Sequence, residues 1–413
     1  MTDSNNEAPH SNTASSGQGL MPLVKSMSAA EAAALLTQHP ASTIAGVLVE
    51  LNPALTQDIL AALPSALADE VFGAVPSRTA SQWRFNQKFA EGTIGRMMEP
   101  VVAVFAPEMT VAQTVEELRT LVKTAFITYG YVVDFTGKLL GVITMRDLLF
   151  SADDARLNTL MLRNAFALTP DLPLADAMKL VLDRHYPAYP VCDAQGVLIG
   201  LVRGQSMFQE QAFEITAQAG AMVGVEKEER LATRWSQSFK FRHPWLQLNL
   251  LTAFAAGAVV GIFEGTVEKL VVLAAFLPVL AGQSGNTGCQ ALAVTLRGLT
   301  LGELKPGAER MLVMKEAALG FMNGAFTGLI AALGMFAYAT MQKSPHALML
   351  AGVVWLALVG ACVVSGICGA MIPLTLKRFG ADPATASSIF LTTATDVVSM
   401  GLLLGLATIL IKL

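Results

Sequence analysis

A single acidic residue, Asp396, lies inside an otherwise apolar stretch near the end of the chain, residues 386–411. A carboxylate at the centre of a membrane helix costs at least ~2.5–3.5 kcal/mol, so an acidic residue there indicates a functional site. No Lys or Arg lies in any of the chain's apolar stretches to neutralise it. The residue therefore predicts a bound cation, and the alternative is a protonated Asp in a helix-to-helix hydrogen bond.

Oxygen-rich side chains and carbonyls around Asp396 favour a hard divalent cation such as Mg²⁺. The predicted metal-binding residues of this pore are Asp396, Ala394, Thr392 and Thr393. Mg²⁺ releases its water reluctantly, so a hydrated ion suits a site with few carboxylates. One Asp per chain supplies only one negative charge for a divalent cation. We therefore expect a symmetric dimer that supplies two Asp carboxylates across a two-fold axis.

A second set of polar residues interrupts the apolar stretch at residues 270–296, which reads "FLPVLAGQSGNTGCQALAV" around its middle. Pro278 is expected to kink or break the helix, because it removes one hydrogen bond. Unpaired amides in lipid cost several kcal/mol, so these side chains should face another helix or a water-filled path. The predicted pore-lining residues are Pro278, Gly285, Asn286, Gly288 and Gln290. The alternative is a packing seam of small residues joined by Asn.

Two further acidic residues, Glu264 and Glu268, follow the first apolar stretch. At the outer mouth of a pore they would raise the local concentration of cations. As an alternative, they are solvated residues at the membrane surface.

The composition supports a membrane domain that could hold these residues. The chain has 413 residues, of which 53% are hydrophobic and 15% charged, whereas soluble domains carry about 25% charged residues. A membrane-spanning helix needs about 20 apolar residues. Five stretches qualify: about 246–263, 270–296, 317–340, 347–376 and 386–411.

The distribution of basic residues predicts the orientation of these spans. Residues 1–20 lack an apolar core, so we expect no signal peptide and a disordered tail over residues 1–26. The basic residues gather on one side of the spans: Arg230, Arg234, Lys240, Arg242, Arg297, Lys305, Arg310, Lys315, Lys377 and Arg378. This pattern predicts a multi-pass protein of the cell (inner) membrane, with its N-terminus in the cytoplasm and its C-terminus outside. The net charge of −4 offers no basic field for nucleic acid.

The half of the chain before the spans contains two kinds of domain. Residues 27–92 predict a helical N-domain of short helices, separated by prolines at intervals of 11 to 13 residues. Residues 93–153 and 154–210 repeat the same order of strands and helices, with hairpin turns at Thr136-Gly137 and Gln195-Gly196. The repeat resembles a tandem pair of CBS modules, and "PVCDAQGVLIGLV" carries that resemblance.

The first repeat contains a candidate nucleotide site. CBS modules hold ribose with a Gly-x-x-Thr/Ser-x-x-Asp turn, and Gly141, Thr144 and Asp147 match it. The resemblance implies ATP as a ligand at this repeat, and the alternative role of Thr144 and Asp147 is to cap a helix. The second repeat departs from the pattern, since it has Arg203 and Ser206 where Thr and Asp are expected.

Residues 211–242 predict a polar connecting helix between the CBS modules and the first span, with "EKEER" in its middle. Such a helix could transmit a cytosolic signal to the pore, and its alternative role is a solvated linker.

In this order of domains, the chain resembles the MgtE family of magnesium channels. The resemblance rests on "HPWLQLNLLTAF", on "QSGNTGCQ", and on the segment from Asp382-Pro383-Ala384 to Asp396. It implies a homodimer with a hydrated Mg²⁺ at Asp396, a connecting ("plug") helix, and closure of the channel by cytoplasmic Mg²⁺ clamped among acidic residues.

The chain departs from this family where the Mg²⁺ sensor should lie. Relatives are acidic at the end of the second CBS module and at the start of the plug helix, but here residues 203–206 read "RGQS" and only Glu214 remains acidic. We therefore expect weakened Mg²⁺ gating. The remaining sensor candidates, each otherwise an ordinary surface charge, are Glu214, Asp153, Asp154, Asp69, Glu70, Glu226, Glu228 and Glu229.

The sequence thus predicts a passive, dimeric divalent-cation channel that is not an enzyme. It contains no GxxxxGK[ST] motif of an ATPase. One alternative is a secondary-active transporter or exchanger of Co²⁺, Mn²⁺ or another divalent cation, with Asp396 as its coupling site. Another is a membrane enzyme regulated by the CBS modules, for which His243 and His346 supply no acid–base cluster.

Overall fold

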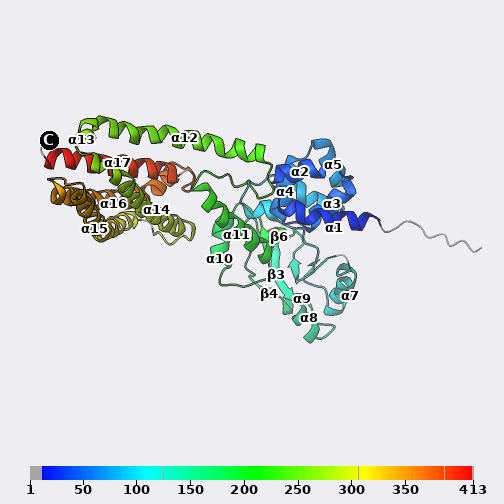
Figure 1. The fold of residues 1–413 in the computed structure, drawn as a ribbon. Helices are drawn as coiled ribbons and strands as arrows, with labels where there is room; N and C mark the ends of the chain where they lie inside the picture. The colour runs from blue at the N-terminus through cyan, green and yellow to red at the C-terminus, as the bar shows by residue number, and fades with distance from the viewer. Residues whose placement is uncertain (1–11, 124, 306, 386, 412–413) are drawn as a thin grey trace, which may run out of the picture. The chain divides into compact units, whose positions relative to one another are not determined.

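The computed structural model describes residues 12–123, 125–305, 307–385 and 387–411, and the chain divides into two compact units. We call residues up to 215 together with 228–233 the cytosolic unit, and residues 216–227 together with 234–413 the membrane unit. Figure 1 shows the elements of both.

Short helices build the first part of the cytosolic unit. They are α1 (Asn12–Lys25), α2 (Ala29–Leu36), α3 (Ala41–Glu50), α4 (Pro53–Ala62), α5 (Ser65–Ala74) and α6 (Ser77–Asn86). Proline stands at the N-cap or first position of α3 to α6, where its missing N–H costs no helical hydrogen bond. Ser28 and Glu31 form a capping box on α2. Leucine, isoleucine and valine side chains of α2 to α5 form the core.

The expectation of a disordered tail over residues 1–26 is wrong for its second half, which forms α1. Leu20 and Val24 of this helix are buried in the core of the short helices. The expectation rested on the polar residues before them and gave no weight to this apolar pair. Residues 1–11 lie outside the described part of the chain.

The two repeats form two similar hairpins. The first repeat contains η1 (Ile94–Met97), β1 (Val104–Phe105), α7 (Val111–Leu121), β2 (Tyr129–Val133), β3 (Leu139–Thr144) and α8 (Met145–Phe150). The second contains α9 (Leu157–Leu160), β4 (Leu162–Arg163), α10 (Leu174–Val181), β5 (Ala188–Cys192), β6 (Leu198–Arg203) and α11 (Gly204–Ala221).

The sheets show how closely the second hairpin copies the first. One sheet has the order β1-β2-β3-β4, and the other pairs β5 with β6. Both hairpins are antiparallel and carry a bulge near the end of the first strand. Their turns place Gly137 and Gly196 at φ 83°, a left-handed conformation that favours glycine. The turns therefore lie where the two Gly residues predict them.

The connecting helix expected over residues 211–242 is not continuous. Helix α11 ends at Ala221, and α12 (Trp235–Ile262) begins after a non-helical segment. Gly224 ends the first helix with φ 78°, and a Cβ at this residue would lie 2.8 Å from Cγ of Trp245. The break thus depends on glycine and on the close approach of a Trp from α12.

The membrane unit consists of long helices. They are α12, α13 (Glu264–Lys269), η2 (Val271–Phe276), α14 (Leu277–Thr300), α15 (Glu309–Met341), α16 (Ala347–Arg378) and α17 (Ser387–Leu410). Among the described residues, four helices are long and apolar enough to cross a membrane: α12, α15, α16 and α17. The stretch 270–296 is not a single helix, because η2 precedes α14 and Pro278 lies in the first turn of α14. Proline therefore starts this helix and does not kink it.

Small residues allow the helices of this unit to pack closely. A Cβ at Gly320 of α15 would overlap the carbonyl of Cys362 in α16, and a Cβ at Gly324 would lie 2.8 Å from Cα of Val359. Helix α14 packs against both α16 and α17. Buried leucines and valines of α16 form the centre of the unit and hold α17 in position.

Candidate functional site

Asp396 lies in the middle of α17 and is half-buried. Among the residues that the structure describes, its carboxylate has no hydrogen bond and no ion pair, although its backbone carbonyl accepts a hydrogen bond from Ser399 Oγ at 3.2 Å. Asp396 is thus an acidic group whose carboxyl has no partner among the described residues, in an otherwise apolar helix.

The threonines before Asp396 donate their hydroxyl protons to the backbone. Thr392 Oγ1 donates to the carbonyl of Ser388 at 2.9 Å, and Thr393 Oγ1 donates to that of Ile389 at 2.7 Å. Each hydroxyl oxygen keeps lone pairs that can accept from water or face a cation. Ala394, the fourth predicted ligand, has only its backbone carbonyl to offer.

Helix α14 approaches α17 just before Asp396. Gly288 is buried, and a Cβ there would lie 2.9 Å from Cδ1 of Leu391. Gly285 is half-buried, and its Cβ position lies 3.9 Å from the hydroxyl oxygen of Thr395. The two glycines therefore act in packing α14 against the helix of Asp396, as the packing-seam alternative predicts.

The amide side chains of α14 lie on its other face. Gln283, Asn286 and Gln290 are exposed in the single chain and recur at the spacing of one helix face. Pro278 is exposed as well, in the first turn. The structure thus brings the glycines to α17 but leaves the amides facing outward from this chain.

Glu264 and Glu268 lie on α13 and are exposed. The residue between them, Thr266, is buried, and its hydroxyl lies 2.7 Å from that of Thr408 in α17. This contact holds α13 against the C-terminal end of α17.

One buried acidic residue of the membrane unit was missed by the sequence analysis. The side chain of Glu316 in α15 is 7% exposed and pairs with Lys315, with 3.5 Å between Nζ and Oε1. The residue stands directly before the stretch 317–340, so the window of apolar residues excluded it. An acidic residue next to such a window was the available signal.

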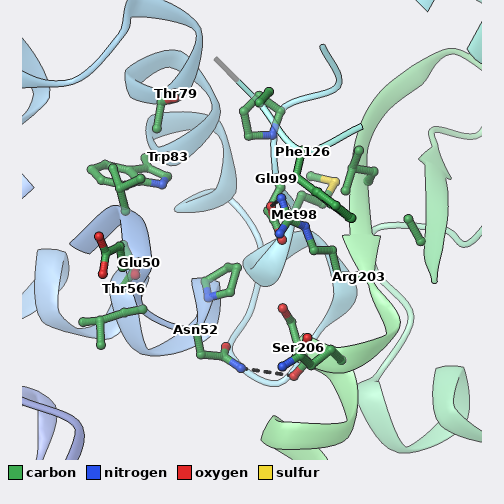
Figure 2. A pocket seen from close by; sticks show the side chains of 18 of the residues that line it. Glu50, Asn52, Thr56, Thr79, Trp83, Met98, Glu99, Phe126, Arg203 and Ser206 are labelled. Atoms are coloured by element: carbon green, nitrogen blue, oxygen red, sulfur yellow. Dashed lines mark hydrogen bonds and ion pairs between the residues drawn. The ribbon is translucent and has the colours of Figure 1, made fainter. Parts of the chain in front are cut away.

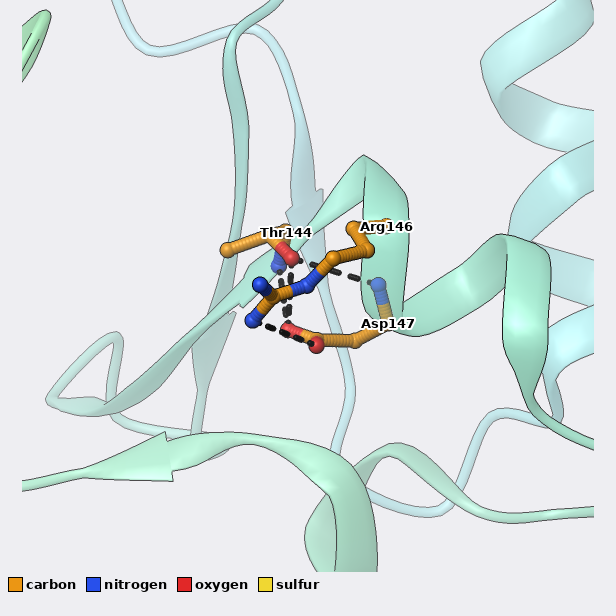
Figure 3. Close-up of polar contacts among 3 residues, drawn as sticks. All are labelled: Thr144, Arg146 and Asp147. Atoms are coloured by element: carbon orange, nitrogen blue, oxygen red, sulfur yellow. Dashed lines mark hydrogen bonds and ion pairs between the residues drawn. The ribbon is translucent and has the colours of Figure 1, made fainter.

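Thr144 and Asp147 form a capping box at the start of α8, so the capping hypothesis is confirmed (Figure 3). Thr144 Oγ1 donates to Asp147 Oδ2 at 2.7 Å, and the backbone N–H of each residue donates to the other's side chain at 3.2 Å. Arg146 lies 3.8 Å from the same carboxylate. A nucleotide at this turn stays a prediction.

A large cavity of about 1170 Å³ lies within the cytosolic unit, between the short helices and the CBS modules (Figure 2). Arg203 and Ser206 of the second repeat line it, whereas Thr144 and Asp147 of the first repeat do not. The Asn52 side chain donates to the Ser206 carbonyl at 3.1 Å. Tyr131 lines the cavity too, and its buried hydroxyl has no hydrogen-bond partner among the described residues.

The acidic residues around this cavity include two that pair with arginine. Glu99 Oε2 lies 3.0 Å from Arg203, and Asp58 Oδ1 lies 3.6 Å from the nearly buried Arg96. Burial raises the pKa of Glu99, and the charge of Arg203 opposes that shift. The sequence analysis missed both pairs, because each joins residues far apart in the chain.

The predicted sensor residues do not gather at this cavity. Asp153 and Asp154 are exposed in the loop after α8, and Asp69 pairs with Arg84 at 3.2 Å on the surface. Glu214 lies on α11, and none of the eight predicted sensor residues lines the cavity. Within the described residues, no group of three or more His, Cys, Asp or Glu side chains could hold a metal ion.

Comparison with known proteins adds two family matches in chain order. Residues 94–154 and 157–208 match the CBS domain, and residues 277–406 match MgtE, described as a divalent cation transporter. A magnesium transporter MgtE of Enterococcus faecalis is 28% identical over 325 residues, which cover 78% of this chain and 70% of that protein. The magnesium transporter MgtE of Thermus thermophilus is 27% identical over 338 residues, 81% of this chain and 74% of that protein.

Among solved structures, the cytosolic domain of the Mg²⁺ channel MgtE in complex with ATP is 24% identical, with a TM-score of 0.42. It covers 48% of this chain and 85% of that domain. The matches of both domain types, and the similarity to three magnesium transporters over 76–81% of this chain, support one conclusion. Residues 277–406 of this chain therefore match the MgtE family, and a pair of CBS domains precedes them.

Proposed function

We propose that the chain conducts hydrated Mg²⁺ through a membrane channel that passes Asp396. The observation that carries the proposal is the Asp396 carboxylate, which has no hydrogen bond or ion pair with any described residue of this chain. A buried charge needs compensation, and a passing cation with its water supplies it. The hydroxyl oxygens of Thr392 and Thr393, one turn earlier, can accept hydrogen bonds from that water.

A pore on a two-fold axis accounts for the exposed amides of α14. Gln283, Asn286 and Gln290 form a polar stripe that would be unfavourable against lipid. A second copy of the chain, with water between the copies, would cover it. With 24 residues, α14 is about 36 Å long and can serve as the fifth span.

An odd number of spans, such as five, puts the two ends of the chain on opposite sides of the membrane. In this proposal the membrane is an inner membrane, the cytosolic unit lies inside the cell and the C-terminus lies outside. The positive-inside pattern supports this orientation, since Arg297 lies in the last turn of α14, Lys305 in the loop after it and Arg310 in the first turn of α15. The membrane potential then drives Mg²⁺ inward, since two charges gain about 4.6 kcal/mol per 100 mV. The exposed Glu264 and Glu268 would lie at the outer mouth and attract cations.

Gating by cytoplasmic Mg²⁺ is weak in this proposal. A bridging cation stabilises a closed state by relieving repulsion between carboxylates. At the cavity of the cytosolic unit, Glu99 and Asp58 already have arginine partners. Strong inhibition of flux by low millimolar internal Mg²⁺ would contradict this part of the proposal.

ATP is proposed as a ligand of the first CBS repeat, at Thr144 and Asp147. The two side chains are part-buried and pair with each other, with Arg146 and with their own backbone. Ribose hydroxyls could exchange with these hydrogen bonds. Calorimetry with ATP tests the assignment, because Asp147→Asn should weaken binding and an unchanged affinity would remove the residue from the site.

Growth rescue of a Mg²⁺-dependent strain tests the function. The wild-type chain should rescue growth, whereas Asp396→Ala and Asp396→Asn should not. Asp382→Asn is the matched control, because Asp382 lies in an exposed turn shortly before α17 and Asn can replace it as an acceptor for Ala384 N–H. Rescue by both Asp396 variants would remove this residue from the pore.

A further inference from the structure

Helix α12 is longer than the apolar layer that it can cross. Its 28 residues extend over about 42 Å, whereas the hydrocarbon layer of a bilayer is about 30 Å thick. About 12 Å of the helix, or about eight residues, therefore lies outside the hydrocarbon. Lys240 and Arg242 show which end this is, because no Lys or Arg follows them in the helix and a cation at the centre of a span is costly. We call residues 235–242 the interfacial turns.

The interfacial turns carry large aromatic side chains that the protein leaves exposed. Trp235 is 83% exposed and Phe239 is 58% exposed. They share one helix face with Leu246 and Leu250, since the four residues follow one another at spacings of four, seven and four. Both leucines are exposed as well, as expected for side chains that face lipid. The lipid-facing surface of the span thus continues into the interfacial turns, where aromatic rings replace its leucines.

Side chains of the next two turns hold the Phe239 ring in place. This ring stacks on the ring of His243, with 4.5 Å between the centroids and 20° between the planes. Nε2 of His243 lies 3.2 Å from Nε2 of Gln247, one further turn along the helix. Because these contacts already order the side chain of Phe239, it loses little freedom when a lipid packs against it.

The charge of the interfacial turns is positive. Lys240 is exposed and forms no ion pair with any residue that the structure describes. Arg242 adds a second positive charge, and α12 contains no Asp or Glu. At this depth the helix meets the phosphate groups of the lipids. The phosphate of a zwitterionic lipid is balanced by the lipid's own ammonium group, so a basic side chain favours lipids with a net negative charge.

We propose that the interfacial turns bind anionic phospholipids of the leaflet in which α12 begins. Lys240 contacts the headgroup phosphate, and Trp235 and Phe239 pack against the glycerol backbone and the first acyl carbons. The proposal needs only that α12 spans the membrane, so it goes beyond the proposed ion path and does not rest on it.

The end of α16 shows the same combination of residues. Lys377 and Arg378 lie in its last turn, and Phe379 at its C-cap is 84% exposed. Two helix ends of different sequence thus place an exposed aromatic ring next to basic side chains. This combination is expected where a span meets lipid headgroups.

Fluorescence of the full-length protein in bilayers tests the site. The bilayers contain phosphatidylglycerol and phosphatidylcholine in equal amounts, and one of the two lipids carries brominated acyl chains, which quench only a nearby Trp. The emission of the wild type minus that of Trp235→Phe isolates Trp235 from the other three Trp residues. At low salt, phosphatidylglycerol should occupy the surroundings of Trp235 at least about fivefold more often than phosphatidylcholine, as expected for a basic residue near an anionic lipid.

The charge of Lys240 should account for much of this preference. Lys240→Gln should lower the preference by about fivefold, whereas Lys240→Arg keeps the charge and should keep the preference. Lys123→Gln is the matched control, because it removes one charge from an exposed residue of the cytosolic unit. That control should leave the lipids around Trp235 unchanged.

Four results would overturn the proposal. If neither brominated lipid quenches Trp235, a protein surface covers the interfacial turns. Equal quenching by the two lipids in the wild type would show that charge has no role, and an unchanged preference in Lys240→Gln would remove this residue from the site. Loss of the preference on addition of soluble glycerol phosphate would assign the site to a free phosphate. These measurements involve no transport, so their outcome is independent of any result on Asp396.

Discussion

Asp396 and Glu99 are both carboxylates with little access to water, but they are compensated in different ways. Glu99 in the cytosolic unit pairs with Arg203 at 3.0 Å. Asp396 in the membrane unit has no partner among the described residues. A buried charge is costly without a counter-charge, so the first site carries a permanent cation. In the proposed function, a passing cation compensates the charge of Asp396 at the second site.

The two CBS repeats have nearly identical hairpins but use one equivalent position for different interactions. Thr144 of the first repeat caps a helix with Asp147, whereas Arg203, at the equivalent position of the second, reaches Glu99. The register is shared, since Tyr129 pairs with Thr144 and Ala188 with Arg203. One backbone thus supports either a helix cap or an ion pair, and the side chain decides between them.

The largest expected effect comes from removing the unpaired charge. Asp396→Asn should lower Mg²⁺ flux into proteoliposomes by at least about tenfold, because the ion loses its only charged partner in the helix. Glu316→Gln removes a buried but paired carboxylate and should lower Mg²⁺ flux by a smaller factor. If Mg²⁺ flux fell equally in the two variants, the difference between paired and unpaired carboxylates would not matter for transport.

A smaller effect is expected from leaving Glu99 without its partner. Arg203→Ala should reduce the free energy of unfolding by about 1–2 kcal/mol, since the pair is partly exposed and therefore screened. The double variant with Glu99→Gln should recover part of the loss. Urea unfolding of the full chain, followed by hydrogen exchange at residues 94–105, measures both changes, and no recovery would speak against the pairing.

The helix cap of the first repeat should contribute about as much to the free energy of unfolding as a typical helix cap. Thr144→Ala is expected to cost about 1 kcal/mol, because it leaves the first N–H groups of α8 unpaired. Thr144→Ser keeps the oxygen and should cost only a few tenths of that value. Thermal unfolding of the two variants compares them, and identical melting temperatures would exclude the capping role.

The pH dependence of Glu99 is the subtlest expectation. Burial raises its pKa above the ordinary value of 4.5, so the folded protein keeps this proton to higher pH than the unfolded chain. The protonated carboxyl stabilises the fold below that value, and this contribution is lost as pH rises through the raised pKa. The stability of the wild type relative to Glu99→Gln should therefore fall as pH rises from the ordinary value of 4.5 through the raised pKa of Glu99. A constant difference would contradict the shift.

Local sequence signals predicted much of the fold. Prolines marked the starts of the short helices, Gly137 and Gly196 marked the hairpins, and apolar length marked α15, α16 and α17. The break after α11 could not be predicted, because it depends on the contact between Gly224 and Trp245 of the next helix. Such contacts form only in the folded chain.

The residues of the candidate sites also differ in this respect: the local sequence indicates some of them, and only the folded structure shows the others. Asp396 could be singled out because a lone carboxylate in an apolar stretch is conspicuous in the sequence itself. The partner of Glu99 lies more than a hundred residues away in the chain, and no local pattern indicates it. Pro278 was expected to kink or break the helix, and the break is confirmed, because η2 ends at Phe276 and Pro278 lies in the first turn of α14.

Anomalous diffraction from crystals grown with Mn²⁺ tests the central claim most directly. The account predicts a peak beside the Asp396 carboxylate, at a distance that leaves room for hydration water, and the loss of this peak in Asp396→Asn. A carboxyl group packed against hydrocarbon or a neighbouring helix, with no metal peak near it, would contradict the proposed path.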